Sequence, residues 1–81
     1  MIELDYSLVI EATEETDYFS FYSPELKGFT GVGQSIEECI SKSKSGMKEH
    51  VKLLKEMGLP VPPKNSDPKI VIQNAQETAV V

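Results

Sequence analysis

The sequence predicts a single α+β domain whose elements follow the order strand, strand, strand, helix, strand, with one long amphipathic helix on one face of the sheet. Three observations predict it: alternating apolar residues near the start, an aromatic segment that ends in a Pro/Gly turn, and a long stretch of helical periodicity between a capping motif and Gly-Leu-Pro. We expect a three-stranded antiparallel sheet to which a fourth strand is added.

The first predicted strand covers residues 2–11, where apolar and polar side chains alternate as in a half-buried strand. Its apolar face consists of Ile2, Leu4, Tyr6, Leu8 and Ile10. Residues 18–22, Tyr-Phe-Ser-Phe-Tyr, are rich in strand-favouring aromatic residues. The polar stretch between them, residues 12–17, is too short for a crossover helix and therefore predicts an antiparallel hairpin.

A tight loop is predicted at residues 23–28, because Pro24 stops strand pairing and Gly28 is free to adopt a positive φ. Residues 29–33 then form a short third strand. Gly31 and Gly33 remove side chains from one face of this strand, where we expect another backbone or a helix to approach closely.

The predicted helix runs from Ile36 to Met57. Ser35 and Glu38 form a capping box, in which the Ser35 hydroxyl accepts from the Glu38 amide and the Glu38 carboxylate reaches back to the cap amide. Gly58 has the place of a left-handed C-terminal residue, followed by Leu59 and Pro60. The apolar face of the helix consists of Ile36, Cys39, Ile40, Ser43, Met47, Val51 and Leu54. Since the helix is longer than any of the strands, its C-terminal end is expected to overhang the sheet.

Residues 59–68 have the proline density of a stiff extended connector, and residues 69–73 are predicted to form the fourth strand. We therefore expect one domain over residues 1–73 and a short C-terminal tail over residues 74–81. The chain has no internal repeat.

Composition limits the function classes. The formal net charge of −5 argues against a large phosphate-binding surface and favours a basic protein partner. One cysteine, Cys39, excludes an intramolecular disulfide and a cysteine-based zinc cluster. No signal peptide and no apolar stretch of the ~20 residues that a membrane span needs is evident, so we expect a cytoplasmic protein without a membrane partner.

Catalytic chemistry has weak support in the sequence. Asp5, Glu11, Glu14, Glu15 and Asp17 suggest a two-metal nuclease, but such a site needs carboxylates that converge from different elements. His50 has no Cys, His or Asp at ligand spacing, and Cys39 has no activating base. We therefore predict no catalytic, metal-binding or cofactor-binding residues, and a protein that acts by binding.

One helix covers only one face of the sheet, so some aromatic side chains are expected to remain exposed for a partner. The candidate partner-binding residues are Tyr18, Phe19, Phe21, Tyr22, Pro24, Glu25 and Leu26. The alternative is that most of the aromatic residues are core residues or cross-strand pairs.

Three segments carry a resemblance to a known family. They are residues 6–10 with the aromatic strand that ends in Ser-Pro-Glu-Leu-Lys-Gly-Phe at 23–29, Gly-Gln-Ser-Ile-Glu-Glu at 33–38, and Gly-Leu-Pro-Val-Pro at 58–62. In their order and spacing they resemble the HicB-like antitoxin family, over most of residues 4–63. The chain departs from the family at Lys27, where a second proline is usual, and at Cys39, where alanine is usual.

The resemblance implies a degenerate ribonuclease-H-like sheet and a role as antitoxin to a small basic HicA-like toxin, an RNA-cleaving protein with a double-stranded-RNA-binding-like fold. Many members carry a C-terminal helix-turn-helix or ribbon-helix-helix segment that binds operator DNA. Only the sixteen positions 66–81, from the end of the connector onward, remain for such a segment here, so we expect no DNA binding by this chain alone. Alternatives are an orphan HicB-like interaction domain and, less favoured, a metal-dependent nuclease.

A domain of 81 residues is small enough for oligomerisation to be expected. We predict a dimer or tetramer, formed by edge-strand pairing or by the overhanging helix end, residues 47–59.

Overall fold

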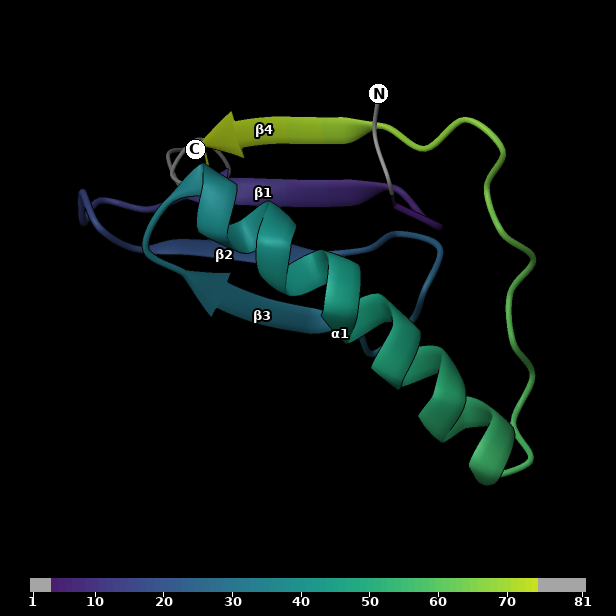
Figure 1. The fold of residues 1–81 in the computed structure, drawn as a ribbon. Coiled ribbons are helices and arrows are strands. Elements are labelled where there is room, and N and C mark those ends of the chain that lie inside the picture. The colour runs from purple at the N-terminus through teal and green to yellow at the C-terminus, as the bar shows by residue number, and fades with distance from the viewer. Residues whose placement is uncertain (1–3, 75–81) are drawn as a thin grey trace, which may run out of the picture.

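The computed structural model describes residues 4–74 and contains the predicted elements in the predicted order. They are β1 (Leu8–Ala12), β2 (Phe19–Tyr22), β3 (Thr30–Gly33), α1 (Ile36–Glu56) and β4 (Ile70–Asn74). The sheet has the strand order β3-β2-β1-β4, and α1 crosses one of its faces diagonally (Figure 1). The α+β fold class is therefore confirmed.

The register of the sheet follows from three pairings. β1 and β2 are antiparallel, with Ile10 opposite Phe21, and β2 and β3 are antiparallel, with Phe21 opposite Gly31. β4 returns to the other side of β1 and runs parallel to it, with Ile72 opposite Ile10. The sheet is thus an antiparallel three-stranded unit with a parallel fourth strand, and β3 and β4 are its edges.

The first strand is shorter than predicted, since its ladder begins at Leu8; its first predicted residues lie outside the described part of the chain. The Ser7 N–H donates to a carboxylate oxygen of Glu25 at 2.7 Å instead of to a neighbouring strand. Leu4 and Tyr6 are nevertheless buried. The alternation therefore predicted the buried face correctly, but it did not show where the ladder starts.

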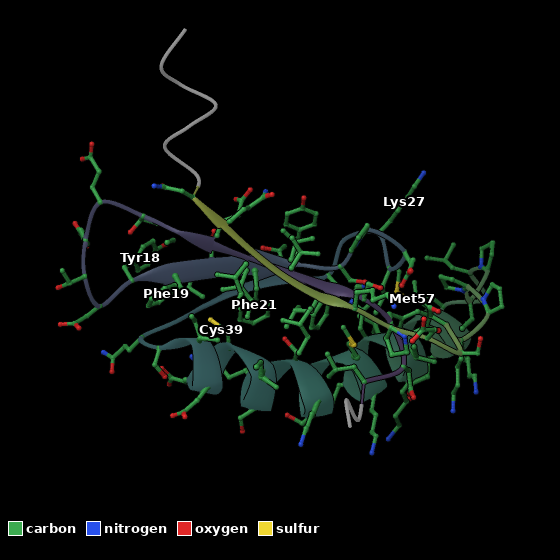
Figure 2. The ribbon with its side chains drawn as sticks, turned by 90° about the horizontal axis from the view of Figure 1, so that it is seen from above. Tyr18, Phe19, Phe21, Lys27, Cys39 and Met57 are labelled. Carbon is green, nitrogen blue, oxygen red and sulfur yellow. The ribbon has the colours of Figure 1, made fainter. Side chains whose placement is uncertain are left out.

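The hydrophobic core lies between α1 and the sheet, and Figure 2 shows Phe21 and Cys39 facing each other across it. The buried core residues are Leu4, Tyr6, Leu8, Ile10, Phe21, Leu26, Phe29, Cys39 and Met47. Ile36, Ile40, Val51 and Leu54 of α1 are partly buried against them. The apolar face predicted for the helix is confirmed.

Two glycines on β3 let α1 and β2 pack closely. A Cβ atom added to Gly31 would lie 2.5 Å from Cζ of Phe21, and one added to Gly33 would lie 2.9 Å from Sγ of Cys39. Both distances are shorter than any ordinary van der Waals contact. The predicted close approach of a helix is confirmed at Gly33, where the neighbour is Cys39 of α1, whereas at Gly31 the space is filled by the ring of Phe21 from β2.

The N-terminus of α1 is capped almost as predicted. The Glu38 N–H donates to Oγ of Ser35 at 3.0 Å. The Glu38 carboxylate, however, accepts from the N–H of Gln34 at 2.6 Å, one residue before the cap. This hydrogen bond holds the pKa of Glu38 below its usual value, and nearby Lys42 acts in the same direction.

The C-terminus of α1 ends in the predicted left-handed glycine. Gly58 has a φ of 72°, its N–H donates to the carbonyl of Lys55 at 3.2 Å, and the Leu59 N–H donates to the carbonyl of Leu54 at 2.9 Å. This pair of bonds defines a Schellman motif. Figure 1 shows the last turns of α1 projecting beyond the sheet. Leu53 and Met57 in these turns are exposed.

Within residues 4–74, α1 is too polar to cross a bilayer, and no other helix of the required length is present there.

Candidate protein-binding surfaces

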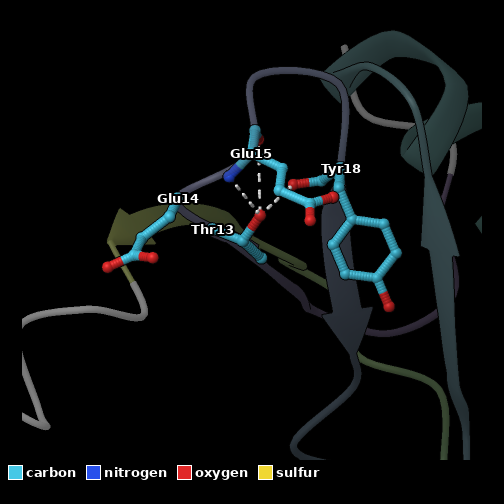
Figure 3. A pocket seen from close by; sticks show the side chains of 4 residues that line it. All are labelled: Thr13, Glu14, Glu15 and Tyr18. Carbon is cyan, nitrogen blue, oxygen red and sulfur yellow. Dashed lines mark hydrogen bonds between the residues drawn. The ribbon is translucent and has the colours of Figure 1, made fainter.

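The loop between β1 and β2 forms a shallow, open hollow of about 360 Å³ at one end of the sheet (Figure 3). Thr13, Glu14, Glu15 and Tyr18 line it. We call these four residues, together with Asp17 of the same loop, the hairpin surface. The Thr13 hydroxyl organises it, because Oγ1 donates to the carbonyl of Tyr18 at 2.8 Å and accepts from the N–H of Glu15 at 3.2 Å. The loop is thus held by its own side chain, with the carboxylates left outside.

The hairpin surface is strongly acidic. Glu14, Glu15 and Asp17 are exposed, and within residues 4–74 none of their carboxylates takes part in an ion pair. In the sequence no lysine comes before Lys27, so the residues that flank the hairpin in β1 and β2 add no positive charge. Tyr18 adds an aromatic side chain that is 43% exposed. The combination suits ion pairs, hydrogen bonds and cation–π contacts with lysine and arginine side chains.

The face of the sheet opposite α1 carries a second surface. The pairing registers place Val71, Val9, Tyr22 and Thr30 in one row across the four strands. Val71 and Tyr22 are exposed, whereas Val9 between them is buried. Tyr22 is therefore one of the aromatic side chains that were expected to remain exposed on the face of the sheet that the helix does not cover.

The structure separates the predicted partner-binding residues. Phe21 and Leu26 are buried in the core, and Phe19 is half-buried against it. Tyr18, Tyr22 and Pro24 are exposed, but Tyr18 lies at one end of β2 and the other two at its opposite end. The seven residues do not form one surface, and for Phe21 and Leu26 the core alternative is the one that the structure favours.

Glu25 has a structural task that the sequence did not reveal. One carboxylate oxygen accepts from the N–H of Ser7 at 2.7 Å, and the other accepts from the side-chain amide of Asn65 at 2.7 Å. Asn65 also donates its backbone N–H to the carbonyl of Asp5 at 2.8 Å. The polar Asn-Ser-Asp segment inside the connector was the available signal, because Asn and Asp there favour local turns that anchor a chain.

We expect the substitution Asn65→Ala to lower the free energy of unfolding by about 1 to 3 kcal/mol, since it leaves a half-buried carboxylate oxygen without its donor. Urea denaturation followed by circular dichroism measures this change. Ser66→Ala, at an exposed neighbouring position, is the matched control and should stay within about 0.5 kcal/mol of wild type. Equal stability of the two variants would contradict the anchoring role.

A third surface lies where the connector passes the projecting end of α1. A groove of about 700 Å³ there is lined by Glu25, Lys27, Leu54, Leu59, Pro60, Val61, Pro62 and Pro63. The Tyr6 hydroxyl fixes the connector by donating to the carbonyl of Pro62 at 2.7 Å. Burial of Tyr6 raises its pKa, so the phenol keeps its proton and the hydrogen bond.

The two residues considered for chemistry have packing roles. Cys39 is buried, and burial raises its pKa, which favours the neutral thiol. Nε2 of His50 lies 3.1 Å from the carbonyl oxygen of Lys27, and its ring packs edge-on against Phe29. Among residues 4–74, no group of three His, Cys, Asp or Glu side chains is placed to hold a metal ion.

Comparison of the chain with protein-family models, curated proteins and solved structures gave no match. The resemblance to the HicB-like family therefore stays a prediction from the sequence.

Proposed function

We propose that this chain is a HicB-like antitoxin that neutralises a small basic RNA-cleaving toxin by direct contact. The segments that carry the resemblance lie at the turns and helix caps that connect the elements of the fold, which supports their use as a family signature. Residues 23–29 form the turn from β2 to β3, residues 33–38 contain the N-terminal cap of α1, and residues 58–62 contain its C-terminal cap. The order of the elements is the one that the resemblance implies.

The hairpin surface is the observation that carries the proposal. A protein that cleaves RNA needs a basic surface to hold phosphates, and an antitoxin can block that surface by presenting carboxylates in place of them. Glu14 and Asp17, which form no ion pair with any residue in 4–74, offer charge of this kind, and exposed Tyr18 beside them offers an aromatic contact. Complementary charge also speeds encounter and sets specificity.

The test combines capture with an RNA-cleavage assay, in which the product of the neighbouring gene is mixed with this chain. The double substitution Glu14→Lys and Asp17→Lys is expected to weaken binding about tenfold or more, with lost inhibition of RNA cleavage. Glu49→Lys with Glu56→Lys on the exposed side of α1 changes the net charge equally and is the matched control. It should bind as the wild type does.

The outcomes separate the alternatives. Capture of a small basic RNA-cleaving protein whose activity disappears on binding supports the antitoxin. Equal loss of binding in both double variants would assign the effect to overall charge and not to the hairpin surface. If no protein is captured and RNA cleavage is not inhibited, the alternative of an orphan interaction domain is favoured. No arrangement of the described carboxylates favours the nuclease alternative.

A further inference from the structure

The two edges of the sheet differ in how they are protected, and the β3 edge is blocked. The Ser23 N–H donates to the carbonyl of Phe29 at 3.4 Å, which fixes the alternation of the antiparallel β2–β3 ladder. Thr30 and Val32 consequently direct their backbone groups outward. Nζ of Lys42 reaches down from α1 and donates to the Val32 carbonyl at 3.0 Å. A charged side chain on an edge is a known device against strand addition.

The lysine on this edge is held in place from α1. The Lys42 ammonium lies 3.6 Å from a carboxylate oxygen of Glu38, which is itself bound to the N–H of Gln34. A strand that approached β3 would have to displace Lys42 from the Val32 carbonyl. It would also leave the Glu38 carboxylate without its cation.

Within residues 4–74, no charged side chain is bonded to the backbone of Ile70 or Ile72 on the β4 edge. The Leu8 N–H donates to the carbonyl of Lys69 at 2.9 Å, and Leu8 pairs with Ile70 in the parallel register. In a parallel ladder alternate residues bond to the neighbouring strand, so Val71 faces β1 while Ile70 and Ile72 point their N–H and C=O groups outward. Within the described chain these outward groups meet no hydrogen-bonding partner.

The side chains of β4 also suit pairing. Ile72 is 53% exposed on the face of α1, which packs over β1, β2 and β3, and Val71 is 44% exposed on the opposite face. The strand Ile70–Asn74 contains no charged residue and no proline. The apolar surface of β4 therefore lies on both sides of an edge at which the backbone groups of Ile70 and Ile72 point outward.

We propose that a second copy of this chain pairs with β4 in antiparallel orientation, about a two-fold axis at Ile72, which joins the two four-stranded sheets into one. This axis places Ile72 opposite its own copy and Val71 opposite Gln73, so no like charges meet. Each copy uses the same edge, and the assembly closes at two. Pairing β3 to β4 would instead be open-ended, and Lys42 opposes it.

Ile72→Lys tests the pairing by placing two ammonium groups opposite each other at the axis. Sedimentation equilibrium should give twice the chain mass of 9.0 kDa for the wild type and a dissociation constant raised about tenfold or more for the variant. Val32→Lys is the matched control, since Val32 is 44% exposed on the blocked edge. It should stay dimeric, and circular dichroism confirms that each variant is folded.

Amide hydrogen exchange supplies a readout that does not depend on a variant. The Ile72 N–H should become protected as the concentration of wild-type protein rises, whereas the Thr30 N–H on the other edge should not change. A monomeric wild type, growth beyond two copies, equal loss of dimer in both lysine variants, or an Ile72 amide that exchanges equally at all concentrations would overturn the proposal.

Discussion

The substitution Leu26→Ala is expected to lower the free energy of unfolding by about 2 to 5 kcal/mol, although Leu26 lies in a turn. Its side chain is 0% exposed and belongs to the cluster between α1 and the sheet. Removal of the side chain loses its transfer free energy and leaves a cavity that the Pro24–Gly28 turn cannot easily fill. A small domain has a total free energy of unfolding of about 5 to 15 kcal/mol, so the loss caused by Leu26→Ala is a large fraction of it. Urea denaturation measures it.

Tyr18→Ala is the matched control, because Tyr18 was predicted for the same partner-binding role as Leu26 but is 43% exposed. Its stability should stay within about 0.5 kcal/mol of wild type, while its affinity for a basic partner falls. Leu26→Ala should bind normally in whatever fraction remains folded. A Leu26→Ala variant as stable as Tyr18→Ala would show that the turn does not contribute to the core.

Features that depend on neighbouring residues were predictable from the sequence. The capping box at Ser35 and the Gly58 stop signal predicted the bounds of α1 to within one residue, because the bonds that end a helix join residues a few positions apart. The period-two spacing of Leu4, Tyr6, Leu8 and Ile10 predicted which face of the first strand packs into the core for the same reason.

Long-range pairings were not predictable in this way. Nothing within the segment around Ile70 indicates that it pairs in parallel with β1, because the partner lies at the other end of the chain. Glu25 looked like a surface residue, since its donor Asn65 is 40 residues away. Leu26 is a single apolar residue between Pro24 and Gly28, so no periodicity could mark it as core.

The candidate surface was predictable in part. Alternation within the aromatic segment separates Phe19 and Phe21 from Tyr22, but it does not say which set faces α1. Gly33, which lies opposite Phe19 in the ladder, indicates the face, because a Cβ atom there would lie 2.9 Å from Sγ of Cys39 on α1. Tyr22 was thereby left on the open face.

Gly31→Ala is expected to lower the free energy of unfolding by about 3 kcal/mol, at the upper end of the range for overpacked cores. On an open strand the same change would stabilise by about 0.5 to 1 kcal/mol, because alanine loses less backbone entropy than glycine on folding. Here the new Cβ would lie 2.5 Å from Cζ and 2.9 Å from Cε1 of Phe21. The Phe21 ring is buried against Phe29, so the clash outweighs the entropy gain. Urea denaturation shows directly whether Gly31→Ala lowers or raises the free energy of unfolding.

A double-mutant cycle identifies the cause of this loss. Phe21→Leu removes the ring atoms that Gly31→Ala would strike, so the combined variant should be more stable than the sum of the two single losses predicts, by about 1 to 3 kcal/mol. Gly58→Ala is the control for a purely backbone effect: Gly58 has a φ of 72° and nothing within 4 Å of an added Cβ. The loss in free energy of unfolding caused by Gly58→Ala should be additive with the loss caused by Phe21→Leu. Additivity of Gly31→Ala as well would mean that the ring of Phe21 is not what excludes a side chain from β3.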